Sequence, residues 1–392
     1  MPTPRAAYSR IGEENAFAVL ARANALAAQG RDIINLGIGQ PDFSTPPHIV
    51  EAAVKALRDG AHGYTPATGI PQLREAIAVD ICARTGADAS PERVLVVPGG
   101  KVTMAMAIDM FGEPGAEILY PDPGFPIYRS MIEFTGATPI PIPIREENAF
   151  AFDPDDVAAR LTDKTRLVIV NSPANPTGGI TPPGDVARLA KILAARPNIA
   201  VLSDEIYARM TYDGLAHRSL ASFPELTNQL ILLDGFSKTY AMTGWRLGYA
   251  LWPAALYDSA RKLAVNYWSC VNAPTQHAGV AALTGPQDAV DTMMAAFDDR
   301  RRAVTEALNA LPGVTCATPK GAFYAFPNIS GTGWKAKPLA DALLNETGVA
   351  LIGGPDFGTL GEGFVRVSYA AAKDRILDAV ARIDTFLRDR AP

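Results

Sequence analysis

An apolar run that ends in a lysine-bearing loop constrains the fold more than any other part of the sequence. Residues 230–233, Leu-Ile-Leu-Leu, have the length and composition of a buried strand. Lys238 follows within a few residues. In α/β sheets, the loops just past the strand ends gather the chemically active side chains. The sequence therefore predicts an α/β protein with a functional lysine at one edge of its sheet.

The neighbours of this lysine indicate what it does. Phe236 and Tyr240 surround Lys238 with aromatic groups, and a lysine in such surroundings is less stable as a cation and acts as a neutral amine nucleophile. Ser237 and Arg246 supply a hydroxyl and a guanidinium, both suited to holding phosphate. An amine able to form a Schiff base, next to groups that hold a phosphate, suggests pyridoxal phosphate as the cofactor.

The same stretch resembles the lysine signature of the class I/II aminotransferases, which are fold-type I pyridoxal phosphate enzymes. The matching positions are Gly235, Ser237, Lys238, Gly244, Arg246 and Gly248. The resemblance implies an α/β fold with a large cofactor-binding domain, built on a mostly parallel central sheet, and a smaller α/β domain. Residues 48–280 are expected to form the large domain, and residues 1–47 together with 281–392 the small one.

A second glycine-rich turn follows the predicted strand at residues 93–97. Gly100 and Lys101 stand where a helix begins, and the free N–H groups at a helix start attract phosphate. The turn is neither a Walker A loop nor a GxGxxG motif, so ATP and NAD are not supported. The resemblance places the cofactor phosphate on Gly100 and Lys101. It also implies that Tyr64 reaches the phosphate of a neighbouring subunit, in a homodimer with shared active sites.

Several further residues are expected around the cofactor ring. Asp204 ends an apolar strand, where a buried acid is costly unless it meets a cation, and a protonated pyridine nitrogen is such a partner. The resemblance implies that Phe125 stacks on the ring and that Asn175 and Tyr207 donate to its phenolic oxygen. It also predicts a cis bond between Asn175 and Pro176.

Arg366 lies inside an apolar strand at residues 364–368 and requires an anionic partner. The resemblance implies that it binds the substrate α-carboxylate, with Gly39, Phe125 and Asn175 also in contact with the substrate. The implied reaction is a ping-pong transamination between an L-amino acid and a 2-oxo acid. Lys238, the general base and acid, would act together with Asp204 and Tyr207.

The identity of the substrate side chain depends on opposing features. Lys101 could read a distal carboxylate, which favours aspartate or glutamate. The segment Glu14-Asn-Ala-Phe17 departs from the Ser/Thr pattern that helps to hold acidic substrates in relatives. Tyr267 and Trp268 would favour an aromatic or aliphatic side chain. The overall expectation leans towards aspartate and glutamate.

Composition excludes several other classes of protein. A net charge of -5 gives no basic footprint for nucleic acid. Three scattered cysteines and four histidines without metal-ligand spacing predict no disulfide framework and no metal site. The sequence contains no run of about 18 apolar residues, so no membrane span is predicted. Its first residues lack the apolar core of a signal peptide. A cytoplasmic enzyme is expected.

Two alternatives remain at this stage. One is a different pyridoxal phosphate reaction, such as β-elimination or decarboxylation, on the same scaffold. The other is a regulatory ligand-binding protein with an aminotransferase-like domain. Such regulators carry a basic winged-helix module ahead of that domain, whereas only about a dozen residues precede Glu13 here.

Regular elements are also expected outside these motifs. Amphipathic helices are predicted at residues 13–29 and 47–58, and a long helical pattern runs from Thr275 to about Leu311. Within that pattern, residues 298–302 (Asp-Asp-Arg-Arg-Arg) are expected to form a solvated charged face.

Overall fold

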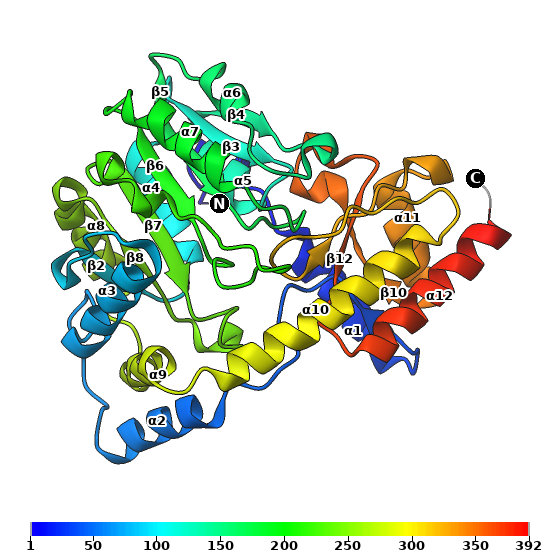
Figure 1. The fold of residues 1–392 in the computed structure, drawn as a ribbon, viewed down its shortest axis with the longest axis horizontal. Coiled ribbons are helices and arrows are strands. Elements are labelled where there is room, and N and C mark those ends of the chain that lie inside the picture. The colour runs from blue at the N-terminus through cyan, green and yellow to red at the C-terminus, as the bar shows by residue number, and fades with distance from the viewer. Residues whose placement is uncertain (1, 391–392) are drawn as a thin grey trace.

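A computed structural model describes residues 2–390, and two lobes are visible in it (Figure 1). The larger lobe is built on a seven-stranded sheet with the strand order β2-β8-β7-β6-β5-β3-β4. Its strands are β2 (Val94–Val97), β3 (Glu117–Asp122), β4 (Thr138–Pro143), β5 (Thr165–Asn171), β6 (Ala200–Asp204), β7 (Leu230–Gly235) and β8 (Gly248–Leu251). Only β8 runs antiparallel to its neighbours. The expected mostly parallel central sheet is confirmed.

Apolar runs become strands here because helices cover both faces of the sheet, so successive side chains on either face are buried. On one face, α4, α5 and α8 pack against alternate strand residues such as Leu95 and Leu233. On the other face, α3, α7 and α9 pack against the intervening residues, such as Val96 and Leu232. The sheet therefore sits in the middle of a three-layer lobe.

Twelve α-helices lie in the part of the chain that the structure describes. They are α1 (Asn15–Ala28), α2 (Pro47–Arg58), α3 (Pro71–Thr85), α4 (Lys101–Phe111), α5 (Ile127–Thr135), α6 (Pro154–Ala158), α7 (Pro183–Ala194), α8 (Ala254–Tyr267), α9 (Ala273–Thr284), α10 (Asp288–Asn309), α11 (Ala336–Ala342) and α12 (Lys373–Asp389). The predicted bounds of α2 are confirmed, and α1 begins two residues later than predicted.

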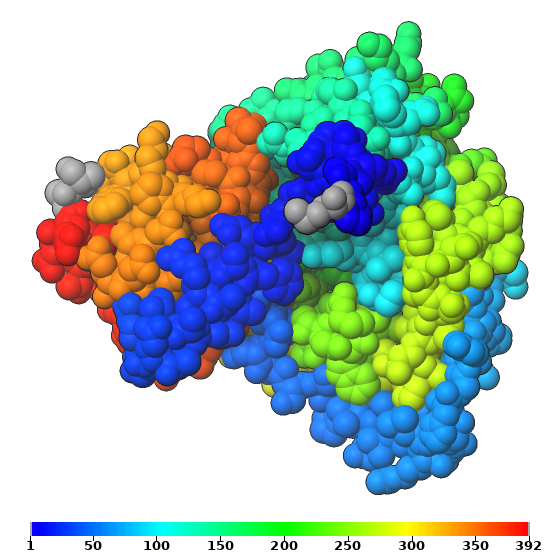
Figure 2. All heavy atoms as spheres, turned by 180° about the vertical axis from the view of Figure 1, so that it is seen from behind, coloured from blue at the N-terminus to red at the C-terminus, as the bar shows by residue number. Residues whose placement is uncertain are grey.

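The smaller lobe joins the N-terminal segment to the C-terminal third of the chain. In it, β1 (Ile34–Asn35) pairs in parallel with β10 (Val349–Ala350). Beside this pair, β11 (Ile352–Gly353), β12 (Val365–Ser368) and β9 (Tyr324–Ala325) form an antiparallel sheet. The long helix α10 extends from the larger lobe to the smaller one (Figure 1). Figure 2 shows the opposite face, where the blue N-terminal segment crosses between the lobes.

Two expectations for the long helical pattern are wrong. The pattern from Thr275 onward is two helices, α9 and α10, because Gly285 and Pro286 interrupt it and proline does not continue a helix. Arg301 does not belong to a solvated face, since it is buried among carboxylates of the same chain.

Within residues 2–390, no helix combines the length and apolar character needed to cross a membrane. In the same part of the chain, no three His, Cys, Asp or Glu side chains cluster in a way that could hold a metal ion.

Candidate active site

A cavity of about 410 Å³ opens where the two lobes meet, and it is lined by groups from both. Asn171, Asp204 and Lys238 come from the carboxyl ends of β5, β6 and the loop after β7. These strands are parallel neighbours, so their ends lie at one edge of the sheet, as the sequence predicted. Glu14, Tyr324 and Arg366 line the cavity from the smaller lobe.

Lys238 is held with its amine against the backbone of the smaller lobe. Its Nζ donates a hydrogen bond to the carbonyl oxygen of Gly39 at 2.5 Å. Removal from water and the nearby positive charge of Arg366 lower the pKa of Lys238 to about 8, while Glu14 acts in the opposite direction. A substantial neutral fraction of this amine therefore exists near neutral pH, as a nucleophile or proton acceptor requires.

Asp204 lies on the floor of the cavity without a cation. Its Oδ2 accepts a hydrogen bond from the Tyr128 hydroxyl at 2.6 Å, and its Oδ1 accepts one from the backbone N–H of Ile206 at 3.3 Å. Burial raises the pKa of Asp204 to about 6. Within residues 2–390 no lysine, arginine or histidine forms an ion pair with it, so a cationic ligand group would satisfy this carboxylate.

One corner of the cavity is suited to a phosphate. Gly100 caps the start of α4, and Ser237 and Arg246 face the same space. Gly99 has φ +91°, and a Cβ at that position would collide with the Arg246 guanidinium, so glycine permits this close approach. Arg246 donates to the carbonyl of Thr243 at 2.7 Å and forms no ion pair within the described chain. Its charge is available to an anion.

At the other end of the cavity, Arg366 is 2% exposed. Its Nη1 donates to Asn175 Oδ1 at 2.9 Å, and its Nη2 donates to the carbonyl of Gly37. Its Nε has no partner, and no carboxylate between residues 2 and 390 pairs with it. No internal salt bridge compensates Arg366 in this part of the chain, and a buried cation of this kind requires an external anion.

Tyr128 and Tyr324 complete the site, and neither was predicted. The Tyr324 hydroxyl lies 2.8 Å from the hydroxyl of the predicted Tyr207, and Tyr128 contacts Asp204 as described above. Gly39 makes room for Tyr324, because a Cβ on Gly39 would collide with the Tyr324 hydroxyl. Tyr128 and Tyr324 carry no local spacing signal, since each meets its partner only through the fold.

The remaining predicted residues are placed as follows. Phe125 and Asn175 line the cavity, and the Asn175–Pro176 bond is cis as predicted. Lys101 also lines the cavity, but its amine pairs with Glu14 at 2.5 Å. Tyr64 is 94% exposed and does not line the cavity of its own chain, so its predicted phosphate contact requires a second copy. Tyr267 and Trp268 also lie outside the cavity lining.

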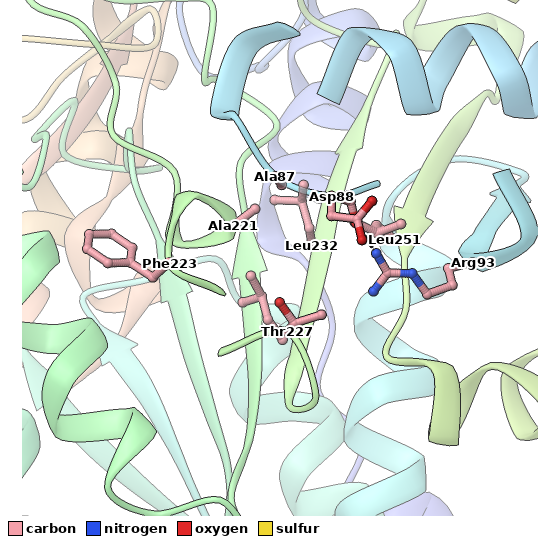
Figure 3. Close-up of a pocket in the computed structure, with 9 residues that line it drawn as sticks. Ala87, Asp88, Arg93, Ala221, Phe223, Thr227, Leu232 and Leu251 are labelled. Atoms are coloured by element: carbon pink, nitrogen blue, oxygen red, sulfur yellow. Dashed lines mark hydrogen bonds between the residues drawn. The ribbon is translucent and has the colours of Figure 1, made fainter. Parts of the chain in front are cut away.

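A second hollow, shown in Figure 3, provides a contrast. It lies at the opposite end of the sheet strands, near Ala87, Arg93 and Thr227, and has a volume of only about 20 Å³. That volume suits a single water molecule. The cavity between the lobes, which gathers Lys238, Asp204 and Arg366, is the candidate active site.

Comparison with known proteins identifies the family. A model of aminotransferase class I and II matches residues 31–383. The chain belongs to this family. An aspartate aminotransferase of Pyrococcus horikoshii is 40% identical over 364 residues, which cover 92% of each chain. An aspartate/prephenate aminotransferase of Cereibacter sphaeroides is 37% identical, covering 96% of this chain and 97% of that one.

A solved structure agrees with the sequence comparisons. The aspartate aminotransferase from Rhizobium meliloti superposes with a TM-score of 0.94 at 32% identity, over 99% of both chains. The expected fold-type I architecture is confirmed. Class I and II aminotransferases are pyridoxal phosphate enzymes that move an amino group between an amino acid and a 2-oxo acid. This is the reaction class of the chain.

The residues in the cavity fit the cofactor of this family. An aminotransferase needs an amine for the cofactor aldehyde, an anion-binding corner for the phosphate, and an acid for the ring nitrogen. Lys238, Arg246 and Asp204 provide these three groups around one cavity. The unpaired charges of Arg246 and Asp204 have the signs that the phosphate and the ring nitrogen require.

Proposed function

We propose that this aminotransferase binds pyridoxal phosphate in the large cavity and transfers amino groups between L-aspartate or L-glutamate and 2-oxo acids. One observation carries the proposal. A lysine amine with a lowered pKa shares a cavity with two cations and one anion that have no ion-pair partner within residues 2–390. Relatives named aspartate aminotransferase support the choice of substrate.

Each part of the cofactor has residues suited to it. The backbone N–H groups of Gly100 and Lys101 and the side chains of Ser237 and Arg246 would hold the phosphate, with Tyr64 supplied by a second subunit. The remaining ring-binding residues are Phe125 at the ring face, Asp204 at the ring nitrogen, and Asn175 and Tyr207 at the phenolic oxygen. When bound, pyridoxal phosphate supplies an electron sink for the electrons of the substrate Cα–H bond.

Lys238 carries the proton in this proposal. Its neutral amine acts as a general base and accepts a proton from the substrate Cα. The ammonium so formed then acts as a general acid and donates that proton back during amino-group transfer. Burial raises the pKa of the Tyr207 phenol well above its usual value, so Tyr207 remains a donor throughout. Asp204 stays ionised above pH about 6 and stabilises positive charge in the cavity.

Arg366 fixes the substrate by its α-carboxylate, with Asn175 alongside and the main chain of Gly39 nearby. A planar guanidinium holds a carboxylate through two parallel hydrogen bonds, which sets the orientation of Cα. Lys101, at the start of α4, is the cation suited to a second carboxylate.

The assembly is proposed to be a homodimer with shared active sites. Tyr64 supports this, since an aromatic side chain 94% exposed gains by burial in an interface. We also propose domains of residues 48–280 and of 1–47 with 281–392. All three cysteines are free, which suits a cytoplasmic location.

The test is Lys238→Ala, compared with the exposed Lys191→Ala as control. Purified protein with pyridoxal phosphate is mixed with aspartate, then with 2-oxoglutarate, and the two products, oxaloacetate and glutamate, are quantified. Lys238→Ala is expected to lower turnover by about 10⁴-fold, whereas Lys191→Ala retains it. Normal turnover in Lys238→Ala would overturn the proposal. Turnover of aspartate beyond one equivalent per active site without a second oxo acid would instead indicate lyase or decarboxylase chemistry.

A further inference from the structure

The Lys101 side chain, assigned above to a second substrate carboxylate, already forms an ion pair in the cavity lining. Lys101 Nζ and Glu14 Oε2 lie 2.5 Å apart, and the two side chains are 43% and 22% exposed. Glu14 precedes α1 on the smaller lobe, and Lys101 begins α4 on the larger one. Both residues line the cavity. The pair therefore bridges the two lobes directly beside the space where a substrate side chain would lie.

The helix that Glu14 precedes does not need this carboxylate. Glu14 occupies the N-cap position of α1, yet its side chain makes no capping hydrogen bond. Acidic N-cap residues usually turn their oxygens back to the free N–H groups of the first turn. Here the carboxylate turns to Lys101 instead, so its geometry is explained by the cavity and not by the helix.

Aromatic rings flank the same lysine. Lys101 Nζ lies 5.1 Å from the ring centre of Phe125 and 5.6 Å from that of Phe17. Because Glu14 balances its charge, Lys101 contributes little net electrostatic field to this part of the cavity. A substrate side chain there would mainly contact the rings of Phe17 and Phe125. Without Glu14, the same region would present an unmatched cation.

We propose that Glu14 is a specificity-determining residue whose carboxylate occupies, on Lys101, the place of a substrate's side-chain carboxylate. This rests on the proposed function, in which Lys101 receives that group. A dicarboxylate must displace Glu14 from Lys101 and tolerate its charge nearby, whereas an uncharged aromatic side chain leaves the pair intact. Glu14 therefore widens the substrate range towards uncharged side chains at the expense of affinity for acidic ones.

The test compares two unreactive carboxylates that lack an amino group. Maleate carries a second carboxylate, and 3-phenylpropionate carries an uncharged ring. Their dissociation constants are measured by calorimetry on the cofactor-loaded protein and on Glu14→Gln. The ratio of 3-phenylpropionate to maleate dissociation constants is expected to rise about three- to tenfold in Glu14→Gln, since partly exposed ion pairs have modest energies. The ratio of kcat/KM for aspartate over phenylalanine should rise in parallel.

Two further variants make the result specific. Glu13→Gln removes the same charge from the adjacent exposed position, which does not line the cavity, and should leave the ratio unchanged. In a Lys101→Met background, Glu14→Gln should raise the ratio less, because only the repulsion between the Glu14 charge and the second carboxylate remains to be removed. An unchanged or lower ratio in Glu14→Gln, an equal rise in Glu13→Gln, or an equally large rise without Lys101 would each overturn the inference. Failure of cofactor loading or of transamination would instead overturn the proposed function, and is observed separately.

Discussion

Two buried arginines, one in a structural cluster and one in the active site, differ in whether the chain itself supplies a counter-ion. Arg301, 1% exposed, forms a bidentate pair with Asp213 at 2.7 and 3.1 Å and donates to Asp298 at 2.8 Å. Arg366 is just as buried, yet no carboxylate within residues 2–390 pairs with it. Burying an uncompensated charge is costly. A fold that satisfies one arginine and not the other reserves the second for a ligand.

Carboxylates show the same division. Hydrogen bonds from Arg301 and Lys320 hold the pKa of Asp213 well below its usual value. Burial instead raises the pKa of Asp204 to about 6. The paired charges of the structural cluster therefore stabilise the fold. The unpaired charges of the active site destabilise it until a ligand of opposite charge binds. The following variants test this division, from the largest expected effect to the smallest.

Replacing Arg301 by glutamine should lower the free energy of unfolding by about 3–5 kcal/mol, because Asp213 and Asp298 lose their buried partner. Chemical denaturation of the purified variant measures this loss. Arg302→Gln is the control, since Arg302 is exposed, and a change of only about 0–1 kcal/mol is expected there. Activity per folded molecule should stay within about twofold in both variants. Equal losses of stability would contradict the contrast.

Replacing Arg366 by glutamine should act on substrate binding and not on folding. We expect kcat/KM for aspartate to fall by about 10²–10³-fold, since a buried guanidinium–carboxylate contact is lost. The free energy of unfolding should not fall, because the removed charge had no internal counter-ion and its burial opposed folding. Steady-state kinetics and denaturation on the same samples measure both. A loss of stability like that of Arg301→Gln would show that Arg366 is structural.

Asp204→Asn should stabilise the cofactor-free protein. The pKa of Asp204 is about 6 in the folded state and 3.8 in the unfolded state. Ionised Asp204 therefore destabilises the folded state fully above pH 6, partly between pH 6 and 3.8, and not at all below pH 3.8. The variant should gain about 1–3 kcal/mol at pH 8 and nothing near pH 3.5. Asp213→Asn should have the opposite sign, losing stability above pH 4. Thermal unfolding across this pH range measures both, and matching signs would contradict the division.

The rate of cofactor capture by the cofactor-free protein should depend on the charge of Lys238. Its pKa of about 8 means that the reactive neutral fraction falls about tenfold per pH unit below pH 8 and levels off above it. In Arg366→Gln the break should move to higher pH, because a positive charge that favours the neutral amine is removed. Stopped-flow absorbance records these profiles. A break near 10.5 would show that Lys238 is not perturbed by its site.

Sequence alone determined the residues that end neighbouring strands. Lys238 and Asp204 were predicted because apolar runs precede them, and parallel strands bring such loops to one edge. Asn175 and the cis bond before Pro176 followed from the resemblance to the family motif. Roles assigned to these residues by family resemblance remain predictions.

Only the tertiary structure decided the partners of these residues. Tyr128 meets Asp204 across 76 residues, Lys101 meets Glu14 across 87, and Tyr207 meets Tyr324 across 117. The sequence predicted a solvent-exposed charged run around Arg301. In the structure, Arg301 is buried and pairs with Asp213, 88 residues away. Side-chain periodicity reports which face of an element is buried, but not which distant element covers it. Which charges pair depends on which distant element covers each face, and only the tertiary packing decides that.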